Sequence, residues 1–429
     1  MDDQGQDKVD DTKDLQKSMT EALSPIEKMP THLLQNIQGA LDQKEAGRTA
    51  LVSKLCKLAW WTMSTLDFND MDYGDSLTGV ATRVLDRYKD ENLRVGSFRL
   101  WSHTINHNDA RNLIRDAINL GARDLAICVG PVGTEKLVLP EEVLGSPTLV
   151  KLCVVGCQVD FRVEVKCKFL EMLHIADLST YGDIFNDLIL KCTKLEKVEM
   201  GYIVNMIQET NMLGPNWENM IGKTSLQSLD LVGVDPVENI TRFEVWAKFP
   251  VLKSLEILDN YSNLNWAGVT ICSPTLESIS LNLFESELTQ AKFEVPSIKE
   301  FEVVAKSTPG VESFKTNSVG WDCNLEIACV ETTQAWFLDL KKLLKIFSSA
   351  VVQLTIRLNY TDAPPDFVFH AQEPKVLHRI KVLNIVASKE ELVPGFLRSL
   401  GWYISTNTLY LGEQNRPDLL NDMQPLPPP

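Results

Sequence analysis

One short apolar pattern recurs from residue 149 onward and constrains the fold more than any other feature of the sequence. Its form is Leu-x-x-Leu-x-Leu, where x is variable and another apolar residue can replace Leu. Seven copies begin 21 to 31 residues apart, and two of them also carry the Cys or Asn that completes the pattern, at Cys157 and Asn260. The apolar positions are Leu149, Leu152, Val154; Leu170, Leu173, Ile175; Leu195, Val198, Met200; Leu226, Leu229, Leu231; Leu252, Leu255, Ile257; Leu276, Ile279, Leu281; and Ile298, Phe301, Val303.

The spacing within each copy predicts a β-strand, because alternate residues of a strand point to opposite faces of a sheet. The last two apolar residues of a copy would point inward, and the residue between them would point to solvent. A single copy cannot cover its own apolar residues, so successive copies must stack and share one core. The segments between the strands are expected to be helical or irregular, with helices over Asp183–Lys191 and Trp336–Phe347.

Further copies extend the pattern toward the C-terminus. They lie at Val351, Leu354, Ile356, Asn359; at Leu377, Ile380, Val382; and, weakly, at Leu409 and Leu411. The pattern resembles the leucine-rich repeat. This resemblance implies an α/β fold, in which a solenoid has a curved, mostly parallel sheet, with helices or irregular segments on its convex side.

Residues 29–69 have a helical periodicity instead, which predicts three short helices. Leu33, Leu34 and Ile37 fall on one helical face after Pro30. A second apolar run follows, and Ser53 is placed to cap a third helix. Three such short helices bury little apolar surface, so we expect them to pack against the rest of the chain and against a partner.

The same stretch matches a known motif at many fixed positions. The matching residues are Met29, Pro30, Leu33, Leu34, Ile37, Leu41, Lys44, Glu45, Ala46, Arg48, Thr49, Val52, Ser53, Lys54, Trp60, Leu66, Asp67 and Phe68. The stretch strongly resembles the F-box, in the form that plants fuse to leucine-rich repeats. Gly47, Leu55 and Cys56 depart from the family's pattern.

The resemblance implies the substrate-recognition subunit of an SCF-type ubiquitin ligase. The F-box would bind a Skp-type adaptor, and through it a cullin-RING complex, while the repeats would bind a protein substrate. Other subunits would transfer the ubiquitin, so the chain would be no enzyme and would need no catalytic residue or cofactor. The expected adaptor-binding residues are Pro30, Leu33, Leu34, Ile37, Leu41, Leu51, Val52 and Trp60.

Other interpretations of the N-terminal stretch stay open. The departures at Gly47 and Cys56 fit a decayed F-box on a repeat-only interaction scaffold. A plain helical cap on the solenoid is a second alternative, because terminal repeats need covering. An enzyme with an unrecognised site is a third, although nothing in the sequence supports it.

Composition and periodicity divide the chain into two tails, the F-box and the repeat domain. Residues 1–28 are polar and acidic and are expected to be a disordered tail, followed by the F-box at 29–69. The repeat domain is expected at 70–412; strand-like triplets lie at 66–68, 98–100 and 125–127, and a helix is predicted over 108–121. Residues 413–429 are polar and end in prolines, which predicts a disordered tail.

Charge and motif content exclude several functions. The net charge of −16 argues against nucleic-acid binding, and no apolar run is long enough to cross a bilayer. Together these features predict a protein of the cytosol or nucleus, with its nine cysteines as buried thiols. His103 and His107 lack the companions of a metal site, and Gly130–Lys136 lacks the spacing of a phosphate-binding loop.

The outward residue of each copy forms a column that the substrate would meet. The column is Cys153, His174, Glu199, Asp230, Glu256, Ser280, Glu302, Thr355 and Lys381. Four acids fall between Glu199 and Glu302, and no base does. One interpretation is a solvated face whose charges serve solubility, with Lys197 or Lys253 nearby to relieve the repulsion between the acids. The sharper hypothesis is an acidic strip at Glu199, Asp230, Glu256 and Glu302 that receives a basic segment of the substrate.

Overall fold

The computed structural model describes residues 25–41, 43–130, 135–159, 163–180, 184–201, 203–205, 223–232, 244–258, 266–283, 287–329, 333–358, 378–387, 389, 393–401 and 404–423. The chain divides into two compact units, Met1–Leu149 and Val150–Pro429. Asn260, Asn359 and Leu377 of the apolar pattern lie outside the described residues, as do residues 1–24 and 424–429 of the two predicted tails.

The three short helices predicted between residues 29 and 69 are present in the first unit. They are α2 (Thr31–Gly39), α3 (Gln43–Thr49) and α4 (Lys54–Trp61), preceded by the 3₁₀ helix η1 (Pro25–Lys28). Ser53 caps α4 as predicted, because its hydroxyl accepts a hydrogen bond from the backbone N–H of Cys56 at 3.0 Å. The helices share a small buried core of Leu34, Cys56 and Ala59.

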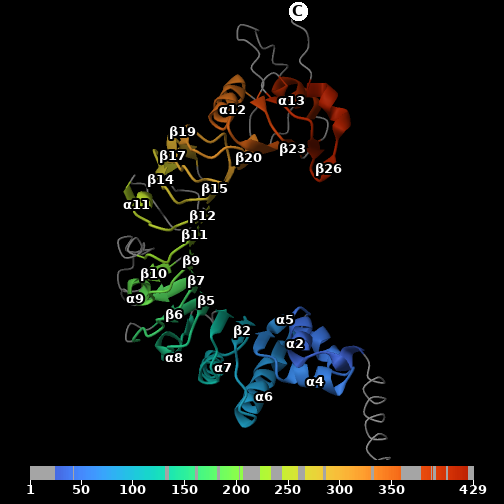
Figure 1. Ribbon diagram of the computed structural model, residues 1–429, viewed down its shortest axis with the longest axis vertical. Coiled ribbons are helices and arrows are strands. Elements are labelled where there is room, and N and C mark those ends of the chain that lie inside the picture. Colours follow the sequence, from blue (N-terminus) through green and yellow to red (C-terminus); the bar gives the residue numbers. More distant parts are fainter. Residues whose placement is uncertain are drawn as a thin grey trace, which may run out of the picture. The chain divides into compact units, whose positions relative to one another are not determined.

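Three parallel strands follow the helices in the first unit, in chain order (Figure 1). They are β1 (Thr65–Asn69), β2 (Ser97–Ser102) and β3 (Asp124–Val129), and they contain the predicted triplets. Leu66, Phe98 and Leu125 pair in register and are all buried. The remaining elements of this unit are α5 (Asp70–Tyr73), η2 (Gly74–Ser76), α6 (Leu77–Asp90), α7 (His107–Asn119), β4 (Leu137–Val138) and α8 (Glu141–Gly145).

The second unit contains a long sheet whose strands follow one another in chain order (Figure 1). The pattern predicted such strands because each copy alternates apolar and polar residues. Every described pairing from β5 to β25 is parallel, and β26 then pairs with β25 in the antiparallel sense. The strands are β5 (Lys151–Val155), β7 (Met172–Ala176), β9 (Lys197–Met200), β11 (Ser228–Val232), β12 (Ser254–Leu258), β15 (Ser278–Leu283), β18 (Glu300–Ala305), β20 (Asp322–Cys329), β21 (Val351–Leu358), β23 (Val382–Ala387), β25 (Leu409–Leu411) and β26 (Gln414–Asn415).

Two strands differ from the prediction. The sequence pattern gave no copy at β20, yet Cys323, Leu325 and Ile327 of this strand are buried between β18 and β21. In β23 the buried residues are Leu383 and Ile385, whereas the pattern put Val382 at an inward position; Ile380, which precedes the strand, is buried as predicted. The pairing of Leu383 with Leu354 of β21 fixes this register, and a shift of one residue exchanges the two faces of a strand.

The segments between the long strands contain short strands as well as helices, so the expectation of helical or irregular connections was incomplete. Two groups of parallel strands are β6 (Cys157–Val159), β8 (Leu178–Thr180) and β10 (Ile203–Asn205), and β14 (Thr270–Cys272), β17 (Ala291–Glu294) and β19 (Val311–Lys315). Two smaller pairs are β13 (Trp266–Ala267) with β16 (Leu288–Thr289) and β22 (His378–Arg379) with β24 (Ile404–Ser405). The described helices are α9 (Ile184–Lys191), α11 (Glu244–Ala247), α12 (Gln334–Ile346) and α13 (Val393–Leu400).

Ordered structure continues past residue 412, where the sequence predicted a tail. After β26 the chain forms the 3₁₀ helix η4 (Pro417–Met423), which packs against α13. The contact is close at Gly401, because a Cβ atom there would collide with the carbonyl group of Met423. Burial of Met423 against this end of the unit accounts for the added turn.

Candidate functional site

Five apolar side chains are exposed on the three helices of the first unit. Leu33 and Ile37 are 44% and 50% exposed and lie one turn apart on α2. Leu51 and Val52, in the turn before α4, are 87% and 65% exposed, and Leu58 on α4 is 51% exposed. We call these five residues the helical apolar surface. A small folded unit that exposes several large apolar side chains is suited to bind another protein.

The other predicted adaptor-binding residues have different environments. Leu34 is only 5% exposed and belongs to the core shared with Cys56 and Ala59, so it holds the helices together. Pro30 is exposed, whereas Leu41 and Trp60 are partly buried. Leu58 was missed by the sequence analysis; its position on α4, three residues from the core residue Leu55, was the available signal.

Two glutamines of α2 fix the positions of the three helices. The side-chain amide of Gln38 donates to the hydroxyl of Thr49 at 2.8 Å and to the carbonyl of Cys56 at 3.0 Å. Gln35 donates to the carbonyl and the hydroxyl of Thr62, at 2.9 and 3.0 Å. Because Gln38 is buried, its two bonds satisfy the N–H groups of its side-chain amide. They also hold α2 against the end of α3 and the first turn of α4.

The end of α4 is attached to α6 within the same unit. Arg87 on α6 donates to the carbonyl of Trp61 at 2.9 Å, and its guanidinium lies 4.7 Å from the centroid of that residue's ring. The hydroxyl of the buried Tyr88 donates to the carbonyl of Met63. These contacts order the helices from one side and leave the helical apolar surface uncovered by described residues.

A row of polar side chains crosses the long sheet of the second unit. Strand pairing places the residues next to one another as predicted from Cys153 to Glu302, and then continues to Asn324 and Gln353. Thr355 is two residues farther along β21, and Lys381 precedes β23, so neither belongs to this row. We call the row His174, Glu199, Asp230, Glu256, Ser280 and Glu302 the polar row.

A lysine that lies beside the polar row neutralises part of its charge. The ammonium of Lys197 lies 2.7 Å from a carboxylate oxygen of Asp230, and the hydroxyl of Ser228 donates to the other oxygen at 3.2 Å. Asp230 is only 6% exposed under these groups, so it is covered. The Nδ1 atom of His174 lies 2.9 Å from a carboxylate oxygen of Glu199. The predicted strip is therefore less acidic than its column of residues suggested.

Glu256 is the acid of the row whose pKa is raised. Partial burial is the main cause, and the neighbouring Asp230 adds to it, while Lys197 opposes the shift. No ion-pair partner of Glu256 lies within 4.0 Å among the described residues. Glu302 is exposed and accepts a hydrogen bond from Ser280 at 3.3 Å. Glu256 and Glu302 are thus the acids of the polar row that remain accessible to another molecule.

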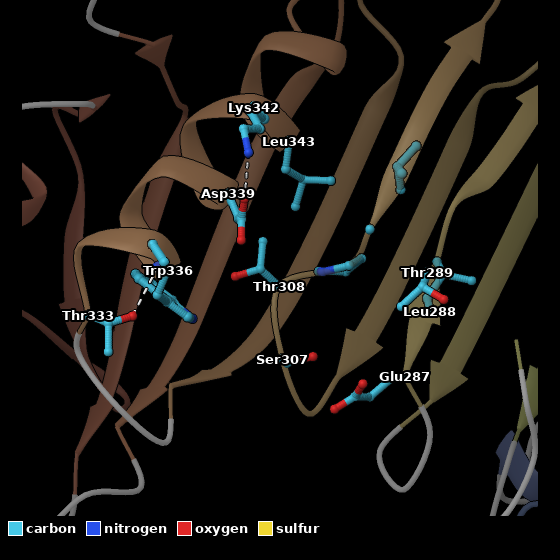
Figure 2. A pocket seen from close by; sticks show the side chains of 14 residues that line it. Glu287, Leu288, Thr289, Ser307, Thr308, Thr333, Trp336, Asp339, Lys342 and Leu343 are labelled. Carbon is cyan, nitrogen blue, oxygen red and sulfur yellow. Dashed lines mark hydrogen bonds and ion pairs between the residues drawn. The ribbon is translucent and has the colours of Figure 1, made fainter. Parts of the chain in front are cut away.

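A cavity of about 500 Å³ lies elsewhere in the second unit, between α12 and the loop of Thr308 (Figure 2). The hydroxyl of Thr333 caps α12 by accepting from the backbone N–H of Trp336 at 3.2 Å, and Lys342 pairs with Asp339 at 2.8 Å. Asp339 and Lys342 of the lining are therefore engaged with each other. The lining offers no nucleophile beside a base, so this cavity carries no recognisable catalytic arrangement.

The residues considered for metal binding have structural roles in the first unit. The backbone N–H of His103 donates to Asp70 at 2.6 Å, and Nε2 of His107 lies 3.5 Å from the carbonyl of Gly130. Within the described ranges, no group of three or more His, Cys, Asp and Glu side chains could hold a metal ion. Most of the loop after Gly130 lies outside those ranges.

The described helices include none whose length and apolar content would let it cross a membrane. Neither the models of known protein families nor the curated protein sequences compared with this chain give a match.

Proposed function

We propose that this chain is the substrate-recognition subunit of an SCF-type ubiquitin ligase. In this proposal α2, α3 and α4 are an F-box that binds a Skp-type adaptor, and the second unit is a leucine-rich-repeat solenoid that binds the protein substrate. The chain supplies binding surfaces, and other subunits of the complex supply the chemistry. The proposal rests on one observation. The helical apolar surface is exposed, although a small core and hydrogen bonds already hold the helices together; its residues are Leu33, Ile37, Leu51, Val52 and Leu58.

The packing of the helices supports a docking role for these residues. The internal core of Leu34, Cys56 and Ala59 and the bonds of Gln38 already hold α2, α3 and α4 together. The exposed apolar residues are therefore not required for that core. A partner that covered them would gain about 25 cal/mol for each Å² of apolar surface removed from water.

The second unit supports the solenoid assignment by its strand order. Parallel strands pair in the order in which they occur in the chain, and each pattern-matched strand from β5 to β18 buries the last two apolar residues of one sequence copy. A repeat stack of this kind presents one long face, which suits the binding of an extended protein segment. The polar row crosses that sheet and is the proposed contact region for the substrate.

Co-purification with a plant Skp-type adaptor tests the proposal. The double variant L51D/V52D places two charges on the helical apolar surface and should abolish adaptor binding without unfolding the first unit. The variant M71D is the matched control, because Met71 is 92% exposed in the same unit but lies outside that surface. L34D is unsuitable for this purpose, since a charge at the buried Leu34 would disrupt the helices themselves. Failure of the wild-type chain to bind any such adaptor would refute the proposal.

The alternative is a repeat-only scaffold on which the three helices are a structural cap. The contacts of Arg87 with Trp61 and of Tyr88 with Met63 favour it, because they attach the helices to the chain itself. A cap predicts that deletion of residues 29–62 destabilises the first unit, while adaptor binding is absent from the intact chain. The adaptor experiment therefore separates the two functions.

A further inference from the structure

A second cavity, of about 430 Å³, lies in the first unit where its three parallel strands end. Alternate residues of β1, β2 and β3 are buried on one face of the sheet, so Asp67, Trp101 and Cys128 share the other face. Trp101 lies in the middle strand and pairs in register with Cys128 of β3. Asp70 and Met71, which follow β1 in the chain, also line the cavity. The cavity therefore combines acidic and apolar side chains.

Trp101 gives this cavity an exposed aromatic wall. It is 46% exposed, and Met71 beside the same cavity is 92% exposed. No described lysine or arginine lies over the ring of Trp101, whereas the cations of Lys57 and Arg87 both lie over the ring of Trp61. Exposed tryptophans are enriched among the residues that dominate protein interfaces, and an indole face attracts cations. The ring of Trp101 is thus available to a cation from another molecule.

The two acids of the lining are not equally engaged. The carboxylate of Asp70 accepts three hydrogen bonds from residues 102–104, at 2.6 to 3.2 Å. The guanidinium of Arg99, by contrast, lies 3.9 Å from a carboxylate oxygen of Asp67. Burial raises the pKa of Asp67, and Arg99 and a hydrogen bond from Asn69 offset this shift only in part. A cation that came closer than Arg99 would therefore stabilise the Asp67 carboxylate further.

We propose that this cavity binds an arginine side chain presented by a partner protein, with the guanidinium stacked on Trp101 and paired with the carboxylate of Asp67. A guanidinium suits both contacts, because it is flat enough to stack on an aromatic ring and it pairs with carboxylates through two hydrogen bonds. A lysine ammonium makes the ion pair but has no flat face to stack. The chain's net charge of −16 also attracts basic segments. Only the identification of this partner as the substrate rests on the proposed function.

Fluorine NMR of the full chain labelled with 5-fluorotryptophan tests the site with a defined probe. The chain has nine tryptophans, and the variant W101F identifies the resonance of Trp101 by its loss. N-acetylarginine methylamide, added to millimolar concentrations, should shift that resonance saturably and leave the others in place. N-acetylcitrulline methylamide has the same shape without the charge and should not shift it, and the lysine analogue should bind several-fold more weakly. No saturable shift with the arginine probe, or an equal shift with the citrulline or lysine probe, would overturn the proposal.

Variants of the charged residues assign the contact. D67N should abolish the shift, whereas D75N should retain it, because Asp75 is exposed in the same unit but does not line the cavity. R99Q should strengthen binding several-fold, since Arg99 no longer competes for the Asp67 carboxylate. The unshifted tryptophan resonances show that each variant is folded. Undiminished binding in D67N, or a loss of binding in R99Q, would overturn the assigned contact. No adaptor is present in these measurements, so the arginine site and the proposed function can fail independently.

Discussion

The guanidinium of Arg87 lies over the ring of Trp61 and also donates a hydrogen bond to the carbonyl of that residue. One side chain of α6 therefore holds the last turn of α4 in two ways. The cation–π contact and the charge-assisted hydrogen bond each contribute on the order of 1 kcal/mol. This contact connects α4 to α6 within the first unit.

The variant R87A should destabilise α4 by about 1–2 kcal/mol, because both contacts are lost. Hydrogen exchange of the backbone amides in Lys54–Trp61 would report the loss as faster local opening. R83A is the matched control, since the exposed Arg83 bonds only within its own helix. Equal exchange in the two variants would show that Arg87 does not anchor α4.

Core and surface leucines of the helical segment should respond differently to truncation. L34A should lower the free energy of unfolding by about 2–4 kcal/mol, because a buried side chain leaves a cavity. L51A should change it by less than about 0.5 kcal/mol, because Leu51 is almost fully exposed. Denaturant titrations of the two variants would test this, and a large loss in L51A would mean that Leu51 packs in the folded chain.

Removal of Lys197 should leave the buried carboxylate of Asp230 without its cationic partner. The free energy of unfolding should therefore fall. We expect K197M to destabilise the second unit by about 1–2 kcal/mol, a range reduced because the lysine itself is partly exposed. The double variant K197M/D230N should recover most of the loss, since it removes the uncompensated charge. Thermal unfolding would compare the stability of the single and the double variant. An equal loss of stability in both would mean that the ion pair does not stabilise the unit.

The raised pKa of Glu256 predicts a pH-dependent stability. A carboxyl group whose folded-state pKa is raised binds its proton more tightly in the folded chain. Its contribution therefore favours folding at acidic pH and is lost as the pH rises through that pKa. E256Q should consequently stabilise the second unit at pH 7 by a few tenths of a kcal/mol, a small effect because the group is exposed.

The matched control for Glu256 is E277Q. Lys299 lowers the pKa of Glu277 through a hydrogen bond, so this substitution should not stabilise the unit at pH 7. Unfolding midpoints measured from acidic to neutral pH would compare the two. If E256Q gives no gain at pH 7, Glu256 is as well solvated as an ordinary surface acid.

Two glycines should respond to alanine with opposite signs. G401A should destabilise the second unit by about 1–3 kcal/mol, because its Cβ would collide with the carbonyl of Met423. G79A in α6 has open space around the new Cβ and should stabilise the first unit by up to about 1 kcal/mol. Calorimetric midpoints would test both, and a tolerated G401A would mean that η4 does not pack closely on Gly401.

The sequence predicted strands best where each copy was complete. From Leu152 to Val303 the apolar spacing identified the buried positions, because one face of each strand must meet the shared core. It failed at β20, where Gly320 stands in place of the first apolar residue and Cys323 begins the buried series. At β23 the run from Val382 to Ile385 permits either alternation, and only pairing with β21 decides it.

The candidate surfaces were predictable to a lesser extent. Helical spacing grouped Leu33, Leu34 and Ile37 together, but it could not tell that Leu34 turns into the core. The strand pairing confirms the predicted column of acids. The net charge of the polar row, however, depends on where the neighbouring lysine side chains lie, which the sequence alone does not determine. Lys197 lies two residues before Glu199 in the chain and nevertheless pairs with Asp230 on the next strand.

The antiparallel turn at the end of the long sheet has a consequence for how molecules of this chain behave together. A final parallel strand such as β25 would present unpaired backbone groups to which a strand of another molecule could add. Here β26 occupies that edge for only two residues, Gln414 and Asn415, both exposed and polar. The chain then leaves in η4 and gives no long edge for further pairing. Among the described residues this edge of the sheet is therefore short and polar, which disfavours the addition of a strand from another molecule.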